Sequence, residues 1–253
     1  MNDSSPSLAA WLPHFFAEWP RQAPDTQLRE PLAVTVDAQQ LSAFFTEMEQ
    51  PLAALRHGTF SFDPWEVAKL GRNEVRNSAV LAWLLDPHGN HGFGSLPLKA
   101  LLGAVRKCGR EAFPENFTRY CRVNVEKYPT GDATNRVDIE VDADNFFMLI
   151  EVKIDAYEQK DQIRRYIGEA KKRAGEQSWA VVYLTPQGRV PLSAGEEADV
   201  TDVPCLSWRR LASVMTQALE PTRRQIFAAP TASPARQMAA HAAFRFLDRM
   251  RQF

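Results

Sequence analysis

The chain has 253 residues, of which 45% are hydrophobic and 10% aromatic, and its net charge at pH 7 is −1. This composition supports a sizeable core and excludes an intrinsically disordered chain, while the nearly neutral charge alone gives no indication of nucleic-acid binding. No apolar stretch approaches the roughly 18 to 20 residues that a membrane span requires, so no membrane association is expected.

The N-terminal segment, residues 1–58, is expected to form a helical extension ahead of a second domain, residues 59–253. An amphipathic stretch predicts a helix over residues 7–19, and a second helix is expected over residues 37–55 with Asp37 as its N-cap. The first residues carry no basic start before their apolar part, so a secretory signal is not expected.

Three helices are expected before the centre of the chain. Pro64 begins a short helix, and Asn73 caps a longer one that Pro87 ends. That longer helix is apolar on nearly all sides at AVLAWLL, which predicts a buried helix. LPLKALLGAVRKCG is the third. In the Gly-rich turn HGNHG, His88 and His91 stand without further ligands, which indicates turn residues rather than a metal site.

The centre of the chain changes to strand patterns. RVNVEKY predicts one strand, and NRVDIEVD predicts another in which apolar and acidic residues alternate between the two faces. FFMLIEVKI is apolar on both faces and therefore predicts a central strand. The helix EQKDQIRRYIGEAKKRAG follows, then the buried strand SWAVVYLT. The packing stripe expected on that helix is Ile163, Ile167, Ala170 and Ala174.

This order of helix, three strands, helix and strand predicts an α/β fold with a mixed sheet and helices on its faces. A loop and two helices, SWRRLASVMTQAL and residues 234–251, would close the chain. Residues 209–253 contain eight arginines and two acids, whereas residues 1–50 contain two basic and seven acidic residues. The C-terminal arginines could face a polyanion or could lie on solvated helix faces, and the sequence leaves both open.

The three cysteines are Cys108, Cys121 and Cys205. They are widely spaced and match neither a zinc pattern nor a disulfide framework. They indicate reduced thiols in a cytoplasmic protein.

Carboxylates gather at the end of the expected central strand. If Val141 pairs with Phe146 across the turn, Asp138 faces Leu149, and Glu151 is the diagonal neighbour of Asp138 on the same face. Two carboxylates that converge at the end of a buried strand repel one another and lose hydration. A divalent cation relieves both effects, and Mg²⁺ favours one or two carboxylates with water and phosphate oxygens.

Lys153 shares this face by alternation and would place a compact positive charge near a water or a phosphate oxygen. The alternative is an ordinary ion pair between Glu151 and Lys153 at a strand end, with Asp138 on a solvated face. This stretch alone does not decide between the two.

Three other features bear on the choice. Glu74 opens the apolar helix, either as a favourable charge at a helix N-terminus or as a further carboxylate aimed at the metal or its water. Gln162 and Tyr166 share a helix face, with Gln159 beside them, and could touch DNA or orient a lysine, or could form a polar surface stripe. A neighbouring stripe of basic residues predicts phosphate contacts or simple solvation; its members are Lys160, Arg164 and Lys171.

The stretches NEVRNSAVLAWLLDPHGNHGFG, NRVDIEV, LIEVKIDAYEQKDQIRRY and VVYLTPQG together resemble the PD-(D/E)XK nuclease superfamily. More narrowly, they are similar to the bacterial branch with an LAWLLDP…HG helix and turn ahead of the core. The resemblance covers roughly residues 60–183. It implies a restriction-endonuclease-like fold with the order of elements given above, and the helical extension expected from the N-terminal sequence precedes this fold.

The resemblance assigns the motif residue by residue. The first acid falls on Asp138, preceded by Val137 instead of proline, and the D/E-x-K half falls on Glu151 and Lys153. The helix-borne acid falls on Glu74, and the Gln-x-x-x-Tyr element of RecB-like exonucleases on Gln162 and Tyr166. The departure is Asn77, where this branch is expected to have histidine.

The resemblance implies three groups of site residues. The metal ligands would be Asp138, Glu151, the Val152 carbonyl and Glu74. The catalytic residues would be Glu74, Asp138, Glu151, Lys153 and Gln162. The substrate contacts would be Gln162 and Tyr166, to which the basic stripe adds Lys160 and Arg164.

These assignments imply a Mg²⁺-dependent nuclease, with Mn²⁺ able to substitute, that hydrolyses phosphodiester bonds of DNA in defence against foreign DNA. RNA as the substrate is the alternative that the sequence leaves open. The partners of the nuclease would be nucleic acid and either a second copy of the chain or another defence component. The alternative is a catalytically silent subunit of the same fold that binds nucleic acid or a partner protein. The sequence leaves sequence specificity and endo- versus exonuclease action open.

Overall fold

The computed structural model describes residues 37–56, 62–127, 137–159, 161–191, 203–229 and 231–253. The chain divides into two units, residues 1–61 and 62–253, and each is described by itself. In the first unit, the carboxylate of Asp37 accepts hydrogen bonds from the N–H groups of Gln39 and Gln40 at 2.9 and 3.2 Å and caps helix α2 (Ala38–Arg56). This confirms the capped helix expected there. The helix expected over residues 7–19 lies outside the described residues.

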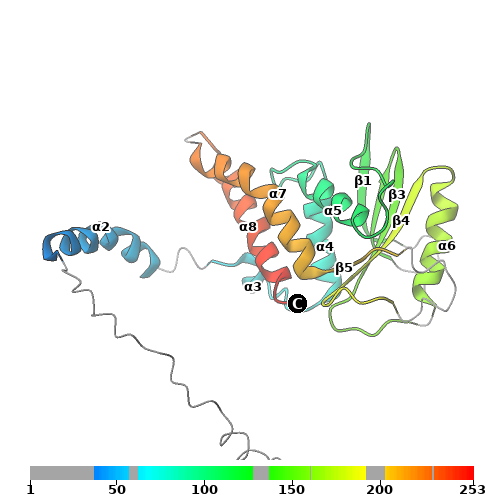
Figure 1. Cartoon of the computed structure of the whole chain (residues 1–253), viewed down its shortest axis with the longest axis horizontal. Coiled ribbons are helices and arrows are strands. Elements are labelled where there is room, and N and C mark those ends of the chain that lie inside the picture. Colours follow the sequence, from blue (N-terminus) through cyan, green and yellow to red (C-terminus); the bar gives the residue numbers. More distant parts are fainter. Residues whose placement is uncertain (1–36, 57–61, 128–136, 160, 192–202, 230) are drawn as a thin grey trace, which may run out of the picture. The chain divides into compact units, whose positions relative to one another are not determined.

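The second unit is built around a mixed sheet of five strands in the order β1-β2-β3-β4-β5 (Figure 1). The strands are β1 (Cys121–Lys127), β2 (Val137–Ala143), β3 (Phe146–Val152), β4 (Ser178–Thr185) and β5 (Cys205–Ser207). The first three are antiparallel, and β3, β4 and β5 are parallel. Every residue of β3 is buried, which confirms the central strand predicted from its apolar residues on both faces. β5 was not expected, because a strand of three residues is too short for a periodic pattern to develop.

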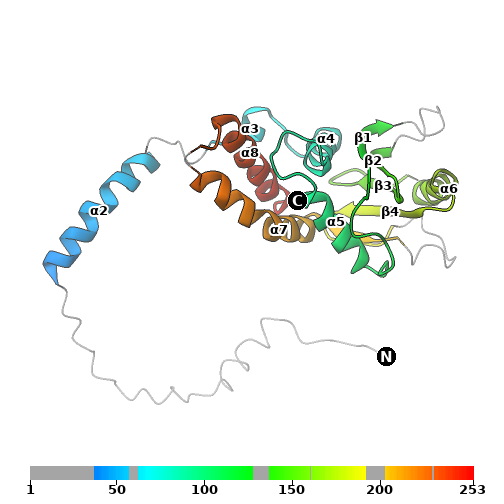
Figure 2. The same ribbon diagram turned by 90° about the horizontal axis from the view of Figure 1, so that it is seen from above.

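Helices cover both faces of the sheet (Figures 1 and 2). On one side lie α4 (Glu74–Leu85), α5 (Leu96–Arg106), α7 (Trp208–Ala228) and α8 (Pro234–Met250), and α6 (Gln162–Ala174) lies on the other. The short helix α3 (Pro64–Val67) packs against α8 and is capped by Asp63. Among the described residues, no helix combines the length and the hydropathy that crossing a membrane would require.

The two faces of the sheet bury two separate cores. The larger one joins the buried leucines of α4 to Ile139, Val141 and Ile150 of the sheet. The prediction of a buried helix is confirmed for these leucines, whereas Ala79 is exposed. The smaller core lies under α6, where the predicted stripe is buried against Phe147 and Leu149 of β3. Truncation of one such buried leucine to alanine typically costs about 2 to 5 kcal/mol of stability, so these clusters hold the helices in place on the sheet.

The register of the β2–β3 hairpin differs from the expected one by two residues. Val141 pairs with Met148 rather than with Phe146, and the turn consists of only two residues, Asp144 and Asn145. Two tertiary contacts account for the tighter turn: Ala143 pairs with Cys121 of β1 and stays in the strand, and the Asp144 carboxylate accepts hydrogen bonds from the backbone N–H groups of residues 118 and 119 at 3.0 and 2.9 Å. A shift of two residues leaves each side chain on its original face.

Helix α7 runs well past the end expected from the sequence. The pattern SWRRLASVMTQAL stops before Pro221, but the helix continues through this proline to Ala228. Proline removes one backbone hydrogen bond from a helix interior. Leu219 and Ile226 are buried on either side of it, and helix α8 packs along the same helix. Tertiary packing therefore outweighs the local penalty.

Candidate active site

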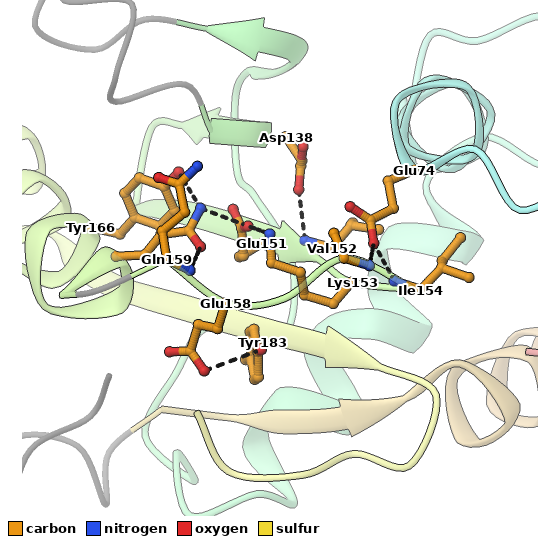
Figure 3. A network of polar contacts seen from close by, with 12 residues as sticks. Glu74, Asp138, Glu151, Val152, Lys153, Ile154, Glu158, Gln159, Tyr166 and Tyr183 are labelled. Carbon is orange, nitrogen blue, oxygen red and sulfur yellow. Dashed lines mark hydrogen bonds and ion pairs between the residues drawn. The ribbon is translucent and has the colours of Figure 1, made fainter. Parts of the chain in front are cut away.

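Carboxylates of neighbouring strands meet where β3 ends, on the face that α6 covers (Figure 3). Ile139 pairs with Ile150, so the next position along the two strands places Asp138 directly opposite Glu151. The expectation that Asp138 faces Leu149 is therefore wrong. The Oδ2 atom of Asp138 accepts a hydrogen bond from the Val152 N–H at 2.8 Å. Residues directly opposite on neighbouring strands are closer than diagonal ones, so the shifted register brings the two carboxylates nearer to each other than expected.

Glu151 lies in an environment that disfavours its charge. Its residue is 1% exposed. Burial, with the nearby negative charge of Asp138, raises the pKa of Glu151 to about 8. The positive charge of Lys153 only partly offsets these two effects, so the group is at the edge of ionisation near neutral pH.

The two oxygens of Glu151 have different surroundings. Oε1 contacts the Lys153 ammonium at 2.5 Å and accepts a hydrogen bond from Nε2 of Gln162 at 2.8 Å. Oε2 is buried and has no hydrogen-bond partner within the part of the chain that the structure describes. A buried polar atom without a partner costs free energy, so Oε2 is well suited to accept a cation.

Lys153 remains an ammonium group. Burial lowers its pKa, but Glu151, Asp138 and Glu74 more than offset this effect, so the pKa of Lys153 lies above its ordinary value. Its backbone is held on both sides, because its N–H donates to the Leu184 carbonyl at 2.8 Å and its carbonyl accepts from the Trp208 indole at 3.1 Å. A rigid backbone fixes the direction from which the positive charge approaches.

Glu74 organises the backbone that follows Lys153. Its Oε1 atom accepts hydrogen bonds from the N–H groups of Ile154, Asp155 and Ala156 at 2.6, 3.1 and 2.9 Å (Figure 3). The helix that carries Glu74 is thereby tied to the end of β3. Its charge is also close enough to contribute to the raised pKa of Glu151.

Gln162 and Tyr166 point into the site from α6. Both are buried, so the alternative of a polar surface stripe is wrong. Besides Glu151, the Nε2 atom of Gln162 donates to the Tyr166 hydroxyl at 3.1 Å, and its Oε1 accepts from the Gln159 N–H at 3.4 Å. Burial, followed by the charge of Glu151, raises the pKa of Tyr166, so the phenol stays neutral. These contacts position Glu151, and a contact with the substrate strand stays a prediction.

The predicted basic stripe falls outside this cluster. Arg164 is exposed on α6, and Lys160 lies outside the described residues. The ammonium of Lys171 lies over the Trp179 ring at 5.3 Å, near the start of β4 and away from the end that carries Glu151. Phosphate contacts by Lys160 and Arg164 therefore stay predictions.

The chemistry of the donor set fits a divalent cation. Asp138 and Glu151 supply carboxylate oxygens, and the strand residue between Glu151 and Lys153 adds the Val152 carbonyl as a candidate ligand. Within the described ranges, no group of three or more His, Cys, Asp or Glu side chains is arranged to hold a metal. Hard cations such as Mg²⁺ are commonly held by one or two carboxylates with water and phosphate oxygens, so two carboxylates suffice.

The histidines of the Gly-rich turn are structural in one case and exposed in the other. The Nδ1 atom of the buried His91 accepts from the Phe93 N–H at 3.1 Å, and Nε2 lies 2.9 Å from the Asp86 carbonyl, so both ring nitrogens are engaged. His88 is exposed. The prediction of turn residues is confirmed for His91.

Two features of the site escaped the sequence patterns. Trp208 is buried in the larger core, and its indole N–H also donates to the Lys153 carbonyl. Tyr183 lies beside Glu151 in the parallel register of β3 and β4, and its hydroxyl donates to Glu158 at 3.4 Å. Neither contact has a local signal, because each joins residues that are distant in sequence.

The C-terminal arginines mainly serve the fold. Five of the eight contact an acid, a carbonyl or a ring of their own unit; these are Arg223, Arg224, Arg245, Arg249 and Arg251. The three cysteines are free thiols, as expected. Contact of the C-terminal arginines with a polyanion therefore stays a prediction.

Comparison with known proteins gives one positive result. The sequence profile of the PD-(D/E)XK nuclease superfamily matches residues 62–240, which is more than half of the chain. Neither the comparison with curated proteins nor the comparison with solved structures gave a match. The match spans the mixed sheet and the cluster at the end of β3. The chain therefore belongs to the PD-(D/E)XK nuclease superfamily.

Proposed function

We propose that this protein is a divalent-metal-dependent deoxyribonuclease. Membership of the superfamily implies hydrolysis of phosphodiester bonds with the help of divalent metal ions. DNA as the substrate, Mg²⁺ as the natural cation with Mn²⁺ as a substitute, and a role in defence against foreign DNA are the finer parts of the proposal. The role in defence rests on analogy with the family alone.

One observation carries the proposal: the Oε2 atom of Glu151 is buried and has no hydrogen-bond partner among the described residues. The donors available to Glu151 both contact Oε1, and Asp138 lies opposite on the next strand. A buried pair of carboxylates with one unsatisfied oxygen is unfavourable for a purely structural ion pair. It is the arrangement expected where a cation completes the site.

Asp138, Glu151 and the Val152 carbonyl would hold the cation. When bound, the cation supplies positive charge to a phosphoryl oxygen and lowers the pKa of water. Lys153 would hold a further positive charge where negative charge develops on the phosphate. Gln162, assisted by Tyr166, would fix the rotamer of Glu151.

The proposal is tested with supercoiled plasmid, linear duplex DNA, single-stranded DNA and RNA in Mg²⁺ or Mn²⁺. Asp138→Asn and Glu151→Gln keep the shape of each side chain and remove its charge, and Lys153→Ala removes the ammonium. Loss of a preorganised charge of this kind typically lowers kcat by about 10² to 10³. We expect cleavage of DNA by the native chain and losses of at least this size in each variant.

Asp142→Asn is the matched control, because Asp142 lies on the same strand and the same face as Asp138 but further along the sheet. It should retain native activity. A folded native protein that cleaves none of the four substrates would contradict the proposal. That result would favour the alternative of a binding subunit on the same fold.

A further inference from the structure

A large aromatic side chain stands in solvent beside the candidate active site. Tyr157 follows Lys153 by four residues and is 92% exposed, the highest value among the exposed large hydrophobic residues that the structure describes. An aromatic ring gains stability from burial. A ring so fully exposed contributes little to folding, and its position next to the site suggests another use.

The backbone before Tyr157 is firmly held. The N–H groups of the three preceding residues donate to Glu74, as described above. Within the same segment, the Asp155 carboxylate forms a two-pronged contact with the Arg72 guanidinium at 2.7 and 2.8 Å. This ion pair also compensates the negative charge of Asp155.

The two residues after Tyr157 also make contacts with the rest of the unit. Glu158 accepts from the Tyr183 hydroxyl, and the Gln159 N–H donates to the Gln162 side chain. Contacts on both sides thus fix the loop. Binding to a preformed loop loses less conformational entropy than binding to a mobile one.

The ring of Tyr157 is open to a ligand. Among the described residues it has no aromatic neighbour, cation or hydrogen-bond partner. Every nucleic-acid base has a π-face that can stack on an aromatic side chain, whatever its identity. In a duplex, neighbouring base pairs cover these faces, so a protruding ring can stack only on an unpaired base or on the last base of an end.

We propose that Tyr157 is a substrate-positioning residue on which an unpaired base of the substrate strand stacks, close to the phosphate that is cleaved. The site then favours single strands or frayed ends over intact duplex. This inference rests on the proposed nuclease function, because the phosphate beside the stacked base is the one that reaches Glu151 and Lys153. The Arg72 guanidinium beside the loop would face the same strand.

Binding is measured in the full chain carrying Lys153→Ala, so that no strand is cut. The probes are a single-stranded DNA oligonucleotide with a 2-aminopurine base, the same strand as RNA, and the corresponding blunt DNA duplex. We expect Tyr157→Ala to weaken single-strand binding about tenfold, within the range for loss of one stacked base, and to abolish quenching of the fluorescent base. Tyr157→Phe should keep both within about twofold, because the ring is retained.

Tyr120→Ala is the matched control. Tyr120 is 50% exposed and precedes β1 beside the β2–β3 turn, at the opposite end of the sheet from Glu151. It should bind all three probes as the parent chain does. Equal losses on single strand and duplex, or no loss in Tyr157→Ala, would overturn the inference, as would the absence of quenching with both DNA and RNA strands.

Cleavage by the chain with native Lys153 separates this inference from the proposed function. If the rate of cleavage falls no more in Tyr157→Ala than in Tyr120→Ala, the stacking role is overturned and the nuclease proposal remains intact. Quenching that depends on Tyr157, without any cleavage by the native chain, overturns the nuclease proposal and supports the stacking role.

Discussion

At the scale of single residues, Glu151 and Lys153 differ from an ordinary ion pair at a solvated strand end. Their residues are 1% and 7% exposed, and the second oxygen of Glu151 has no partner among the described residues. Burial removes the hydration of both charges, so a buried ion pair is costly unless further charges or hydrogen bonds satisfy its remaining polar atoms. The surroundings of Glu151 therefore favour the metal-ligand hypothesis that the sequence left open.

Two substitutions of Glu74 distinguish a role in holding the backbone after Lys153 from a role as a metal ligand. Glu74→Gln keeps one acceptor oxygen for the three backbone N–H groups, whereas Glu74→Ala removes it. Hydrogen bonds to a charged group are about twice as strong as neutral ones. We therefore expect nuclease activity to fall about tenfold in Glu74→Gln and about a hundredfold in Glu74→Ala, in line with losses at groups that orient a metal site. Equal and complete losses in steady-state assays would instead assign Glu74 to the cation itself.

His91 predicts a dependence of stability on pH. Burial lowers its pKa in the folded chain, and the nearby Asp86 carbonyl only partly offsets this effect. Below about pH 6.5 the unfolded chain binds a proton on His91 that the folded chain does not, so this contribution to stability is lost as pH falls from there toward the folded pKa.

The measurement is urea unfolding from pH 5 to 8. His91→Gln should reduce the loss of stability below about pH 6.5 and should destabilise the protein by about 1 to 3 kcal/mol at pH 8, the usual cost of disturbing a buried hydrogen-bonded group. The exposed neighbour His88 provides the control, and His88→Gln should change neither quantity. An unchanged pH profile in His91→Gln would contradict the assignment.

At the scale of elements, the site depends on how α6 is seated on the sheet. The last turn of α6 carries Arg173, whose guanidinium pairs with the buried Glu140 of β2 and lies over the Phe147 ring at 4.5 Å. The first turns of the same helix present Gln162 and Tyr166 to Glu151. One end of α6 is thus fastened to the sheet while the other end positions the carboxylate.

Removal of Arg173 tests this arrangement. Arg173→Ala leaves Glu140 buried without its cation, which typically costs about 3 to 5 kcal/mol for a fully buried pair. The Arg173 side chain is 31% exposed. We therefore expect a smaller loss, about 2 to 3 kcal/mol, in urea unfolding.

Two further variants complete the Arg173 experiment. Adding Glu140→Gln should recover part of the stability, because the buried charge is removed with its partner. Lys172→Ala, on the same turn and exposed, should leave stability unchanged within about 0.5 kcal/mol. A destabilisation of equal size in Lys172→Ala would mean that loss of positive charge at the C-terminal end of α6, not loss of the ion pair, is measured.

At the scale of the whole molecule, the apolar cores, the sheet and the candidate site all lie within the second unit. The boundary expected at residues 58 and 59 stays a prediction, as do a homodimer, a partner from a defence system and a cytoplasmic location. The carboxylates Asp138 and Glu151 converge only in the folded unit. A cation that binds them should therefore raise the stability of the whole unit.

Thermal unfolding with and without Mn²⁺ or Mg²⁺ checks that coupling. A cation at one hundred times its dissociation constant adds about 2.7 kcal/mol of stability. For a domain of about 150 to 250 residues, each kcal/mol shifts Tm by about 2 to 4 °C, so we expect a rise of about 5 to 10 °C. The rise in Tm should vanish in the double variant that carries both Asp138→Asn and Glu151→Gln, and it should persist in Asp142→Asn. An equal rise in all of these proteins would place the cation elsewhere.

The sequence by itself determined the class of fold and the residue types of the site. Periodicity identified β2, the buried β3 and the stripe of α6, because hydrophobic patterns follow the geometry of strands and helices directly. The motif residues Asp138, Glu151 and Lys153 were assigned to one face, and this survived the error in register because a shift of two residues preserves faces.

Only the tertiary structure decided which groups touch. The register of β2 on β3, the continuation of α7 through Pro221, and the short strand β5 depend on neighbours that are distant in sequence. The same holds for the roles of Glu74 and Gln162, whose hydrogen bonds cross between elements. Local patterns encode the face that a side chain occupies, whereas the partner it meets there is fixed by packing of the whole unit.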